Sequence, residues 1–171
     1  MLSLVKNWEA DFAEYVRARG PALRNLAYLI CGDWHRADDH AQGALVSLYV
    51  AWRRIDHQDN LDAYARRTLV NTVLNERRRP WRRERTVTAF PDPPVPAQAE
   101  RVAQSLALRD ALRALPPRQR AAVVLRYWED MSVADTAALL GVAEGTIKAS
   151  CARGLAALRN ALSEAGIEEA R

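Results

Sequence analysis

Apolar residues recur at intervals of three and four along nearly the whole chain, which is the spacing of one face of an α-helix. The seven glycines are spread thinly, and no two-residue turn lies between alternating strands. We therefore predict an all-α protein. Four prolines within residues 91–96 exclude regular structure there, because proline lacks an amide donor. We expect two small helical bundles, residues 1–85 and 101–171, joined by a proline-rich linker over residues 86–100.

The N-terminal bundle is predicted to hold four helices, over residues 8–19, 21–31, 34–52 and 61–79. Pro21 suits the first position of the second helix, and Asp33 suits the N-cap of the third. The third helix has a core stripe of residues at helical spacing, namely Trp34, Ala37, Ala41, Leu45, Leu48 and Trp52. The corresponding stripe of the fourth helix is Leu61, Tyr64, Ala65, Thr68, Leu69 and Thr72.

The C-terminal bundle is also predicted to hold four helices, over residues 101–114, 117–128, 133–140 and 144–164. Ser132 suits the N-cap of the third, and Gly141 ends it. Residues 133–150 meet the spacing of a helix-turn-helix. Ala137 is small where the helices cross, Gly141 tolerates the positive φ of the turn, and Ile147 is the apolar anchor six residues later. An ordinary helical hairpin is the alternative, and we favour DNA binding.

The last helix carries an apolar stripe that includes Ile147 and Cys151, so we expect Cys151 to be a core residue rather than a reactive thiol. The residues that point away from this stripe or flank it at the helix N-terminus are the candidates to enter a DNA major groove. They are Thr146, Lys148, Ala149, Ser150 and Arg153. Arg153 is best placed for a base edge, whereas Lys148 suits a phosphate.

Charge is distributed unevenly along the chain. The net charge is +4, from 25 basic and 21 acidic residues. Residues 66–85 hold eight arginines against two glutamates, whereas residues 33–62 hold six aspartates against three arginines. A basic segment that directly follows an acidic one indicates two different partner surfaces. Arginine greatly outnumbers lysine, which a GC-rich genome explains at least as well as phosphate binding does.

A second candidate nucleic-acid surface lies on the helix over residues 61–79. Arg67, Asn71, Asn75 and Arg78 share one face away from the core stripe, and asparagine suits base edges while arginine suits phosphates. A solvated charge run is the alternative.

A third surface lies opposite the core stripe of the helix over residues 34–52. It consists of Asp39, Gln42, Gly43, Val46 and Val50. A solvated face is not expected to carry two valines and a glycine, so we interpret it as a protein-docking face. The alternative is that another helix of the same bundle covers it.

The sequence lacks the residue patterns of an enzyme or a metal site. The three histidines show no ligand spacing, and no phosphate-binding loop or nucleophile motif occurs. We expect no catalytic residues, no metal and no cofactor. The apolar runs are too short to span a membrane, and the first residues do not resemble a signal peptide, so we expect a cytoplasmic protein.

Four segments in order carry a resemblance to a known family. They are Asp33–Tyr49 (DWHRADDHAQGALVSLY), Ala63–Arg79 (AYARRTLVNTVLNERRR), Leu112–Arg126 (LRALPPRQRAAVVLR) and Gly145–Arg159 (GTIKASCARGLAALR). Together they resemble the extracytoplasmic-function sigma factors of bacterial RNA polymerase, in particular the actinobacterial SigE-type group. Two positions depart from that pattern: Gly43 stands where an acid is usual, and Ser150 where many members have arginine.

The resemblance implies a specificity subunit of RNA polymerase rather than an enzyme. The docking face would bind the clamp coiled coil of core polymerase through Asp39 and Gln42, with a second contact to the flap. Residues 1–85 would also recognise and melt the −10 element, through Asn71, the arginines, and a reading loop over residues 53–60 that includes Asp59 and Asn60. Residues 101–171 would read the −35 element. An anti-sigma factor is a further candidate partner, and the sequence leaves open whether this chain has one.

Two other functions remain as alternatives at this stage. A stand-alone repressor or activator would use the helix-turn-helix but would leave the docking face and the basic helix unexplained. An RNA-binding enzyme or accessory factor would account for the arginines but lacks a catalytic set. We also expect the two bundles to pack weakly or not at all in solution unless an inhibitor holds them together.

Overall fold

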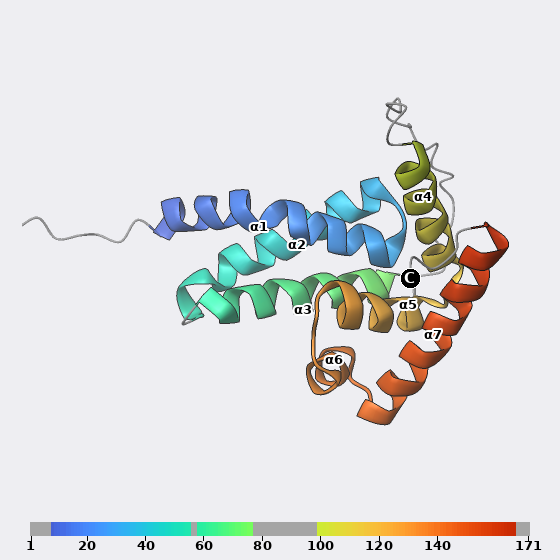
Figure 1. Ribbon diagram of the computed structural model, residues 1–171. Helices are drawn as coiled ribbons and strands as arrows, with labels where there is room; N and C mark the ends of the chain where they lie inside the picture. Colours follow the sequence, from blue (N-terminus) through green and yellow to red (C-terminus); the bar gives the residue numbers. More distant parts are fainter. Residues whose placement is uncertain (1–7, 56–57, 77–98, 167–171) are drawn as a thin grey trace, which may run out of the picture.

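The computed structural model describes residues 8–55, 58–76 and 99–166, and within these ranges the chain is helical with short connections. Figure 1 shows the arrangement. The α-helices are α1 (Trp8–Cys31), α2 (Trp34–Ala51), α3 (Gln58–Glu76), α4 (Ala99–Ala114), α5 (Pro117–Val123), α6 (Val133–Leu140) and α7 (Glu144–Glu164). A 3₁₀ turn, η1 (Trp52–Arg54), follows α2, and a π-helical turn, η4 (Val124–Trp128), follows α5. The predicted all-α class is confirmed. Within the described ranges, no helix combines the length and apolar character that a bilayer span requires.

The first helix differs from the prediction, since α1 is continuous where two helices were expected to meet at Pro21. Proline removes one amide donor from a helix interior, which usually bends or ends it. Here the buried face continues across the proline in register, from Tyr15 to Leu23, Leu26 and Ile30. Packing of this face against the rest of the bundle therefore outweighs the lost hydrogen bond.

Helices α1, α2 and α3 lie lengthwise beside one another (Figure 1). Asp33 caps α2 as predicted, because its Oδ1 accepts a hydrogen bond of 3.0 Å from the backbone amide of Arg36. Leu26, Leu48 and Leu69 are almost fully buried between the three helices. The predicted stripe of α2 is buried at its centre, and its two tryptophans are half-buried at the ends.

Helix α3 departs from the prediction in its start and in part of its buried face. It begins at Gln58, so Asp59 and Asn60 belong to its first turn rather than to a reading loop. No glycine or proline prevents a helical start there, and a polar first turn is stable when it faces solvent. Tyr64 and Thr72 were expected in the core but are exposed, whereas Val70 and Val73 are fully buried. The buried arc of α3 is therefore wider on one side than its sequence pattern indicates.

The C-terminal helices form the predicted helix-turn-helix. Ser132 caps α6, and Gly141 ends it with a left-handed φ of 64°. A small core of Ala122, Ala137, Ile147 and Cys151 holds α6 and α7 together against α5. Gly154 permits the closest approach in this part, since a Cβ there would lie 2.5 Å from Val123 Cγ2.

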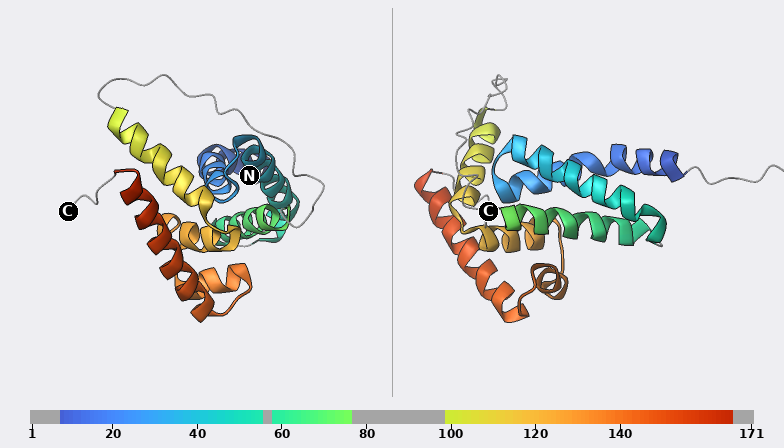
Figure 2. Two further views of the ribbon diagram at one scale, coloured as in Figure 1. Left: turned by 90° about the vertical axis from the view of Figure 1, so that its right-hand side faces the viewer. Right: turned by 180° about the vertical axis from the view of Figure 1, so that it is seen from behind.

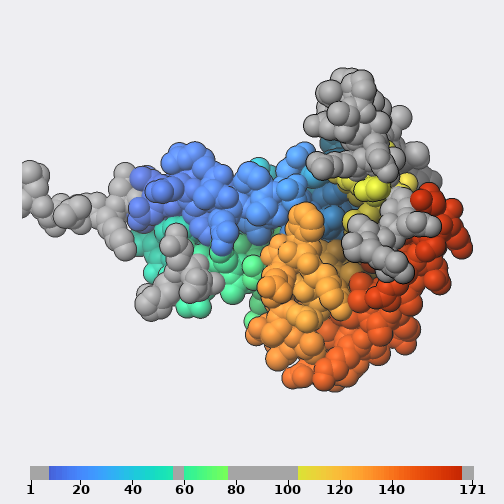
Figure 3. All heavy atoms as spheres, viewed as in Figure 1, coloured from blue at the N-terminus to red at the C-terminus, as the bar shows by residue number. Residues whose placement is uncertain are grey.

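The two parts pack against each other, which contradicts the expectation of weak or absent packing. Figure 2 shows α4 and α7 lying across one end of the three-helix bundle. In the space-filling view, the C-terminal part abuts α1 and α3 (Figure 3). Leu112 and Leu115 of α4 and its following turn are buried in the same core cluster as Ile30 and Cys31 of α1.

Candidate nucleic-acid and protein interfaces

The face of α2 opposite its buried stripe is open. Val46 is 62% exposed and Val50 is 70% exposed. Asp39, Gln42 and Gly43 are exposed as well, and a Cβ built on Gly43 would meet no atom within 4 Å. The alternative that a helix of the same chain covers this face is therefore wrong for the described residues. An exposed patch of two valines with a glycine and flanking polar groups is typical of a protein-binding surface.

Beside this face, α2 is anchored by charged contacts to its neighbours. The guanidinium of Arg36 lies 3.2 Å from Glu76 Oε2 at the end of α3, and His40 Nε2 lies 2.7 Å from the same oxygen. Burial lowers the pKa of His40 despite the opposing effect of Glu76, so the fold favours the neutral form of the imidazole. These contacts fix the orientation of α2 and leave Asp39 and Gln42 pointing outward.

The polar face predicted on the following helix is present on α3. Arg67, Asn71 and Asn75 are exposed along one side of the helix, and Asn60 is exposed in its first turn. Tyr64 is 37% exposed and lies at helical spacing between Asn60 and Asn71. The sequence pattern missed it because an aromatic residue beside Ala65 fits a core stripe equally well. The position of Arg78, the side chain of Asp59 and the arginine run after residue 76 lie outside the described residues.

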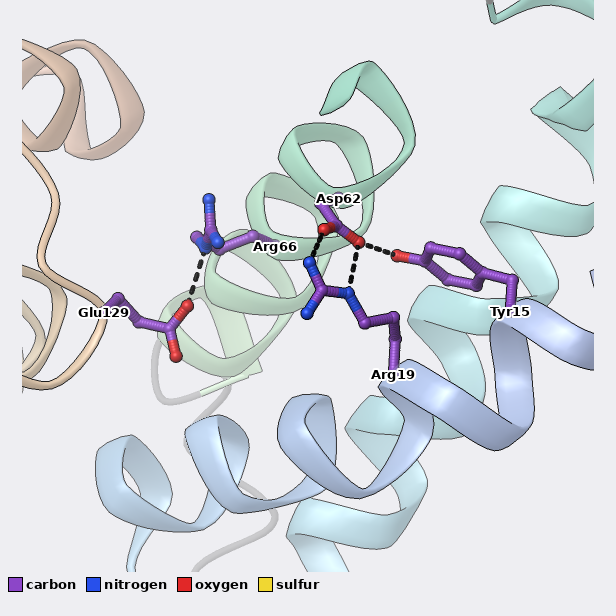
Figure 4. Close-up of polar contacts among 5 residues, drawn as sticks. All are labelled: Tyr15, Arg19, Asp62, Arg66 and Glu129. Atoms are coloured by element: carbon purple, nitrogen blue, oxygen red, sulfur yellow. Dashed lines mark hydrogen bonds and ion pairs between the residues drawn. The ribbon is translucent and has the colours of Figure 1, made fainter. Parts of the chain in front are cut away.

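The other side of α3 is tied to its neighbours (Figure 4). Asp62 accepts hydrogen bonds from the hydroxyl of Tyr15 at 2.8 Å and from Nε of Arg19 at 3.1 Å. One turn later, Nε of Arg66 donates to Glu129 Oε2 at 2.9 Å. The two contacts hold the α3 backbone, so that Arg67 and Asn71 face away from the protein.

The start of α7 presents the predicted recognition residues. Thr146, Lys148, Ala149 and Arg153 are exposed, and Ser150 is half-buried. Cys151 is buried, and burial raises the pKa of its thiol, which confirms the predicted core role. A helix N-terminus with exposed arginine, lysine and threonine side chains suits a DNA major groove.

A further exposed patch was not foreseen. Tyr127 is 57% exposed and Trp128 is 63% exposed at the end of η4, where the π-helical turn directs both side chains outward. The sequence pattern does not reveal this patch, because Tyr127 and Trp128 continue the apolar pattern of the helix that precedes them. Among the described residues, no group of three or more His, Cys, Asp or Glu side chains is placed to hold a metal ion.

Comparison with protein families gives two matches that follow each other along the chain. The family described as "Sigma-70 region 2" matches residues 15–83, and the family described as "Sigma-70, region 4" matches residues 105–158. The first match includes the exposed faces of α2 and α3, and the second includes the whole helix-turn-helix.

Individual relatives agree with these matches. The chain is 40% identical over 152 residues to an "RNA polymerase sigma-E factor" of Streptomyces coelicolor, covering 89% of this chain and 86% of that protein. It is 36% identical over 157 residues to the "ECF RNA polymerase sigma factor SigM" of Mycobacterium tuberculosis, covering 88% and 76%. Among solved structures, the sigma factor RpoE from Bartonella quintana, in complex with the anti-sigma factor NepR, superposes with a TM-score of 0.70 at 25% identity. The superposition covers 90% of this chain and 97% of that one.

Proposed function

The chain belongs to the extracytoplasmic-function group of the sigma-70 family, and on that premise we propose that three exposed helix faces bind core polymerase, the −10 element and the −35 element, respectively. The protein is a specificity subunit of RNA polymerase that binds core polymerase and promoter DNA, and it is not itself an enzyme. We propose which residues make each contact, and we propose that the protein acts in the cytoplasm.

The exposed face of α2 is the proposed docking surface for core polymerase. The observation that carries this assignment is the open valine patch, Val46 and Val50, beside Gly43, Asp39 and Gln42. Burial of exposed valine side chains favours association, and the missing Cβ of Gly43 allows a partner backbone to come close. The clamp coiled coil of core polymerase is the partner that the family implies for this face.

The exposed face of α3 is the proposed −10 contact and the start of α7 the proposed −35 contact. On α3, the residues are Asn60, Arg67, Asn71 and Asn75, together with Asp59 and Arg78. On α7, they are Thr146, Lys148, Ala149, Ser150 and Arg153. Amide side chains and arginine on the first face suit bases and phosphates, and the second face has the geometry of a recognition helix.

Replacement of Asp39 and Gln42 by alanine tests the docking surface. Both side chains are exposed, so the double variant should keep its helicity and its unfolding free energy to within about 0.5 kcal/mol. It should bind core polymerase at least tenfold more weakly in a pull-down or a fluorescence titration. The matched control is Glu14→Ala with Asn25→Ala, which removes one acid and one amide from exposed positions on α1. Equal core binding by both double variants would refute the docking assignment.

An anti-sigma factor is a proposed regulatory partner, supported by the relative of known structure that was solved with one. The protein should then be recovered from its native cells, in the absence of core polymerase, with a second protein bound. That protein, once purified, should inhibit run-off transcription by the sigma factor with core. A bound protein that leaves transcription unchanged would count against this partner.

A further inference from the structure

Lysine is almost absent from the chain. Two of the 25 basic residues are lysines, namely Lys6 and Lys148, and the others are arginines. Among the described residues, Lys148 is the one lysine, and it lies near the N-terminus of α7 on the proposed −35 face. A bias of the genome toward arginine acts on all basic positions alike. A lysine that remains on a DNA face therefore indicates that this position depends on a property that arginine lacks.

Contact with a phosphate does not by itself require lysine at position 148. Arginine binds phosphate at least as well, because its planar guanidinium donates two parallel hydrogen bonds. Arg153 is exposed on the same face of α7, so a guanidinium is accommodated there. The property that separates the two residue types is reactivity. Lysine carries a primary amine that accepts an acyl group, whereas the guanidinium of arginine keeps its proton throughout the physiological pH range.

The surroundings of Lys148 leave its amine accessible. The side chain is exposed, and it forms no hydrogen bond or ion pair with the part of the chain that the structure describes. Its neighbours one turn away on α7 are Glu144, Gly145, Cys151 and Ala152. Cys151 is buried, Ala152 carries only a methyl group, and a Cβ built on Gly145 would meet no atom within 4 Å. A small acyl donor can therefore reach the amine without displacing a bulky side chain.

We propose that Lys148 is a site of acylation by an activated acyl donor, an acyl phosphate or an acyl thioester, and that the modification weakens −35 binding. The unprotonated Nζ attacks the carbonyl carbon of the donor, and a C–N bond forms. The bond from that carbon to phosphate or thiolate breaks, and the leaving group departs with the bonding electrons. The proton lost from nitrogen passes to solvent, so a neutral amide replaces the ammonium group. This proposal rests on the proposed assignment of Lys148 to the −35 contact.

The loss of one positive charge has a calculable effect on DNA binding. Each phosphate contact contributes about 0.9 to the slope of log K against log salt, so the loss of one contact weakens binding about eightfold at about 0.1 M salt. The docking face lies on α2, where it is separate from α7. The acylated protein therefore keeps its affinity for core polymerase while its holoenzyme binds promoters more weakly.

Acylation of the full chain by small donors tests the reactivity of Lys148. The purified protein is treated with acetyl phosphate in one arm and with acetyl-coenzyme A in the other, and peptide mass spectrometry measures the acetylated fraction of each lysine. We expect at least one donor to modify Lys148, and the donor that does so identifies the source. Promoter DNA bound to the holoenzyme should slow this modification, and core polymerase alone should not. An unmodified Lys148 in both arms would overturn the proposal, as would its unmodified state in protein isolated from growing and from stationary native cells.

Site-specific incorporation of Nε-acetyl-lysine at position 148 tests the consequence. The template is a promoter selected from a random library by the wild-type holoenzyme. The acetylated protein should bind core polymerase normally, whereas its holoenzyme should bind this promoter about eightfold more weakly at about 0.1 M salt, with a salt slope lower by about one. The matched control is Nε-acetyl-lysine at position 6, the other lysine of the chain, which should leave promoter binding unchanged. Equal promoter binding by the two acetylated proteins would overturn the proposal.

Two substitutions separate the failure of this proposal from the failure of the proposed function. Lys148→Arg keeps the charge but cannot be acylated in this way, so treatment with the acyl donor should not change its promoter binding. A treated Lys148→Arg protein that loses binding as the treated wild type does would place the effect at another amine and overturn the proposal. Lys148→Ala tests the DNA contact itself. If it weakens promoter binding while Lys148 proves unreactive, the −35 contact stands and acylation alone is refuted, whereas unchanged binding by Lys148→Ala would refute the contact.

Discussion

Gly43→Ala separates the docking role of α2 from its role in the fold. Gly43 lies in the interior of α2, is exposed, and has no atom within 4 Å of an added Cβ. Alanine is preferred over glycine inside a helix by about 0.8–1 kcal/mol, so the variant should be more stable than the wild type. For a chain of this size, that gain raises the melting temperature by about 2–4 °C.

The same methyl group should weaken binding to core polymerase. A methyl group inserted into a close contact typically costs about 1–3 kcal/mol, and a loss of 1.4 kcal/mol corresponds to a tenfold weaker affinity. We therefore expect a more stable protein that binds core about tenfold more weakly. Thermal unfolding by circular dichroism and a fluorescence titration with core polymerase measure the two quantities.

Gly145→Ala is the control for this experiment. Gly145 lies in the first turn of α7 with open space around it, so its substitution adds a methyl group to a helix away from the docking face. It should leave core binding within twofold of the wild type. If Gly43→Ala were stabilised and bound core as tightly as the wild type, no partner backbone would approach Gly43, and the reasoning would fail.

Further variants test the remaining assignments. Arg153→Ala should lower −35-dependent transcription and relax base preference at one position by about 1–3 kcal/mol, measured by binding to a set of substituted promoters. Lys148→Ala should weaken DNA binding on all sequences and reduce its salt slope by about one. Gly154→Ala should destabilise the fold by about 1–3 kcal/mol in urea unfolding, because its Cβ would overlap the side chain of Val123, and a second change, Val123→Ala, should recover part of the loss. His40 has a lowered pKa in the fold, so below pH 6.5 the unfolded chain binds a proton that the native state excludes, and stability falls. His40→Gln should flatten this dependence between pH 8 and pH 5; an unchanged slope would contradict it.

The features that sequence predicted well are those that depend on a few neighbouring residues. A helix cap needs one side chain within reach of an amide two or three positions later, and Asp33 and Ser132 both satisfy this condition. The turn of the helix-turn-helix needs a residue that tolerates positive φ, which Gly141 provides. The exposed faces of α2 and α7 followed from the angular separation of their core stripes. Such features are encoded within one turn or one helix.

The predictions that were wrong concern features that depend on contacts with residues far away in the sequence. Pro21 predicts a break from local preference alone, but the packing on both sides of it keeps α1 continuous. Val70 and Val73 lie at one edge of the buried arc of α3, where a single-helix pattern does not reveal a neighbour. The packing of the two parts was missed for the same reason. The composition of the linker indicates only that an extended segment joins the two parts. It carries no information about the hydrogen bonds that Arg113 and Arg120 make to backbone carbonyls at the end of α1.

The arginine content illustrates why position, rather than number, assigns a role. Genome composition and phosphate binding both explain an excess of arginine, and the structure adds a third cause. Arg19, Arg24, Arg36 and Arg66 each pair with a carboxylate inside the described chain, whereas Arg67 and Arg153 are exposed on the proposed DNA faces. Arginine suits pairing with carboxylates within the chain because its planar guanidinium makes several hydrogen bonds in fixed directions.

Arg120 is a buried arginine that links the two parts of the chain. Its side chain is 2% exposed and donates to the carbonyls of Arg113, Leu115 and Ile30. Two of these carbonyls end α4 within the C-terminal part, and only that of Ile30 belongs to the N-terminal part. The two carbonyls from its own part would by themselves keep the guanidinium paired, and a buried charge without a partner is costly. Only one of the three hydrogen bonds of Arg120 therefore joins the two parts of the chain, and the other two hold the turn after α4.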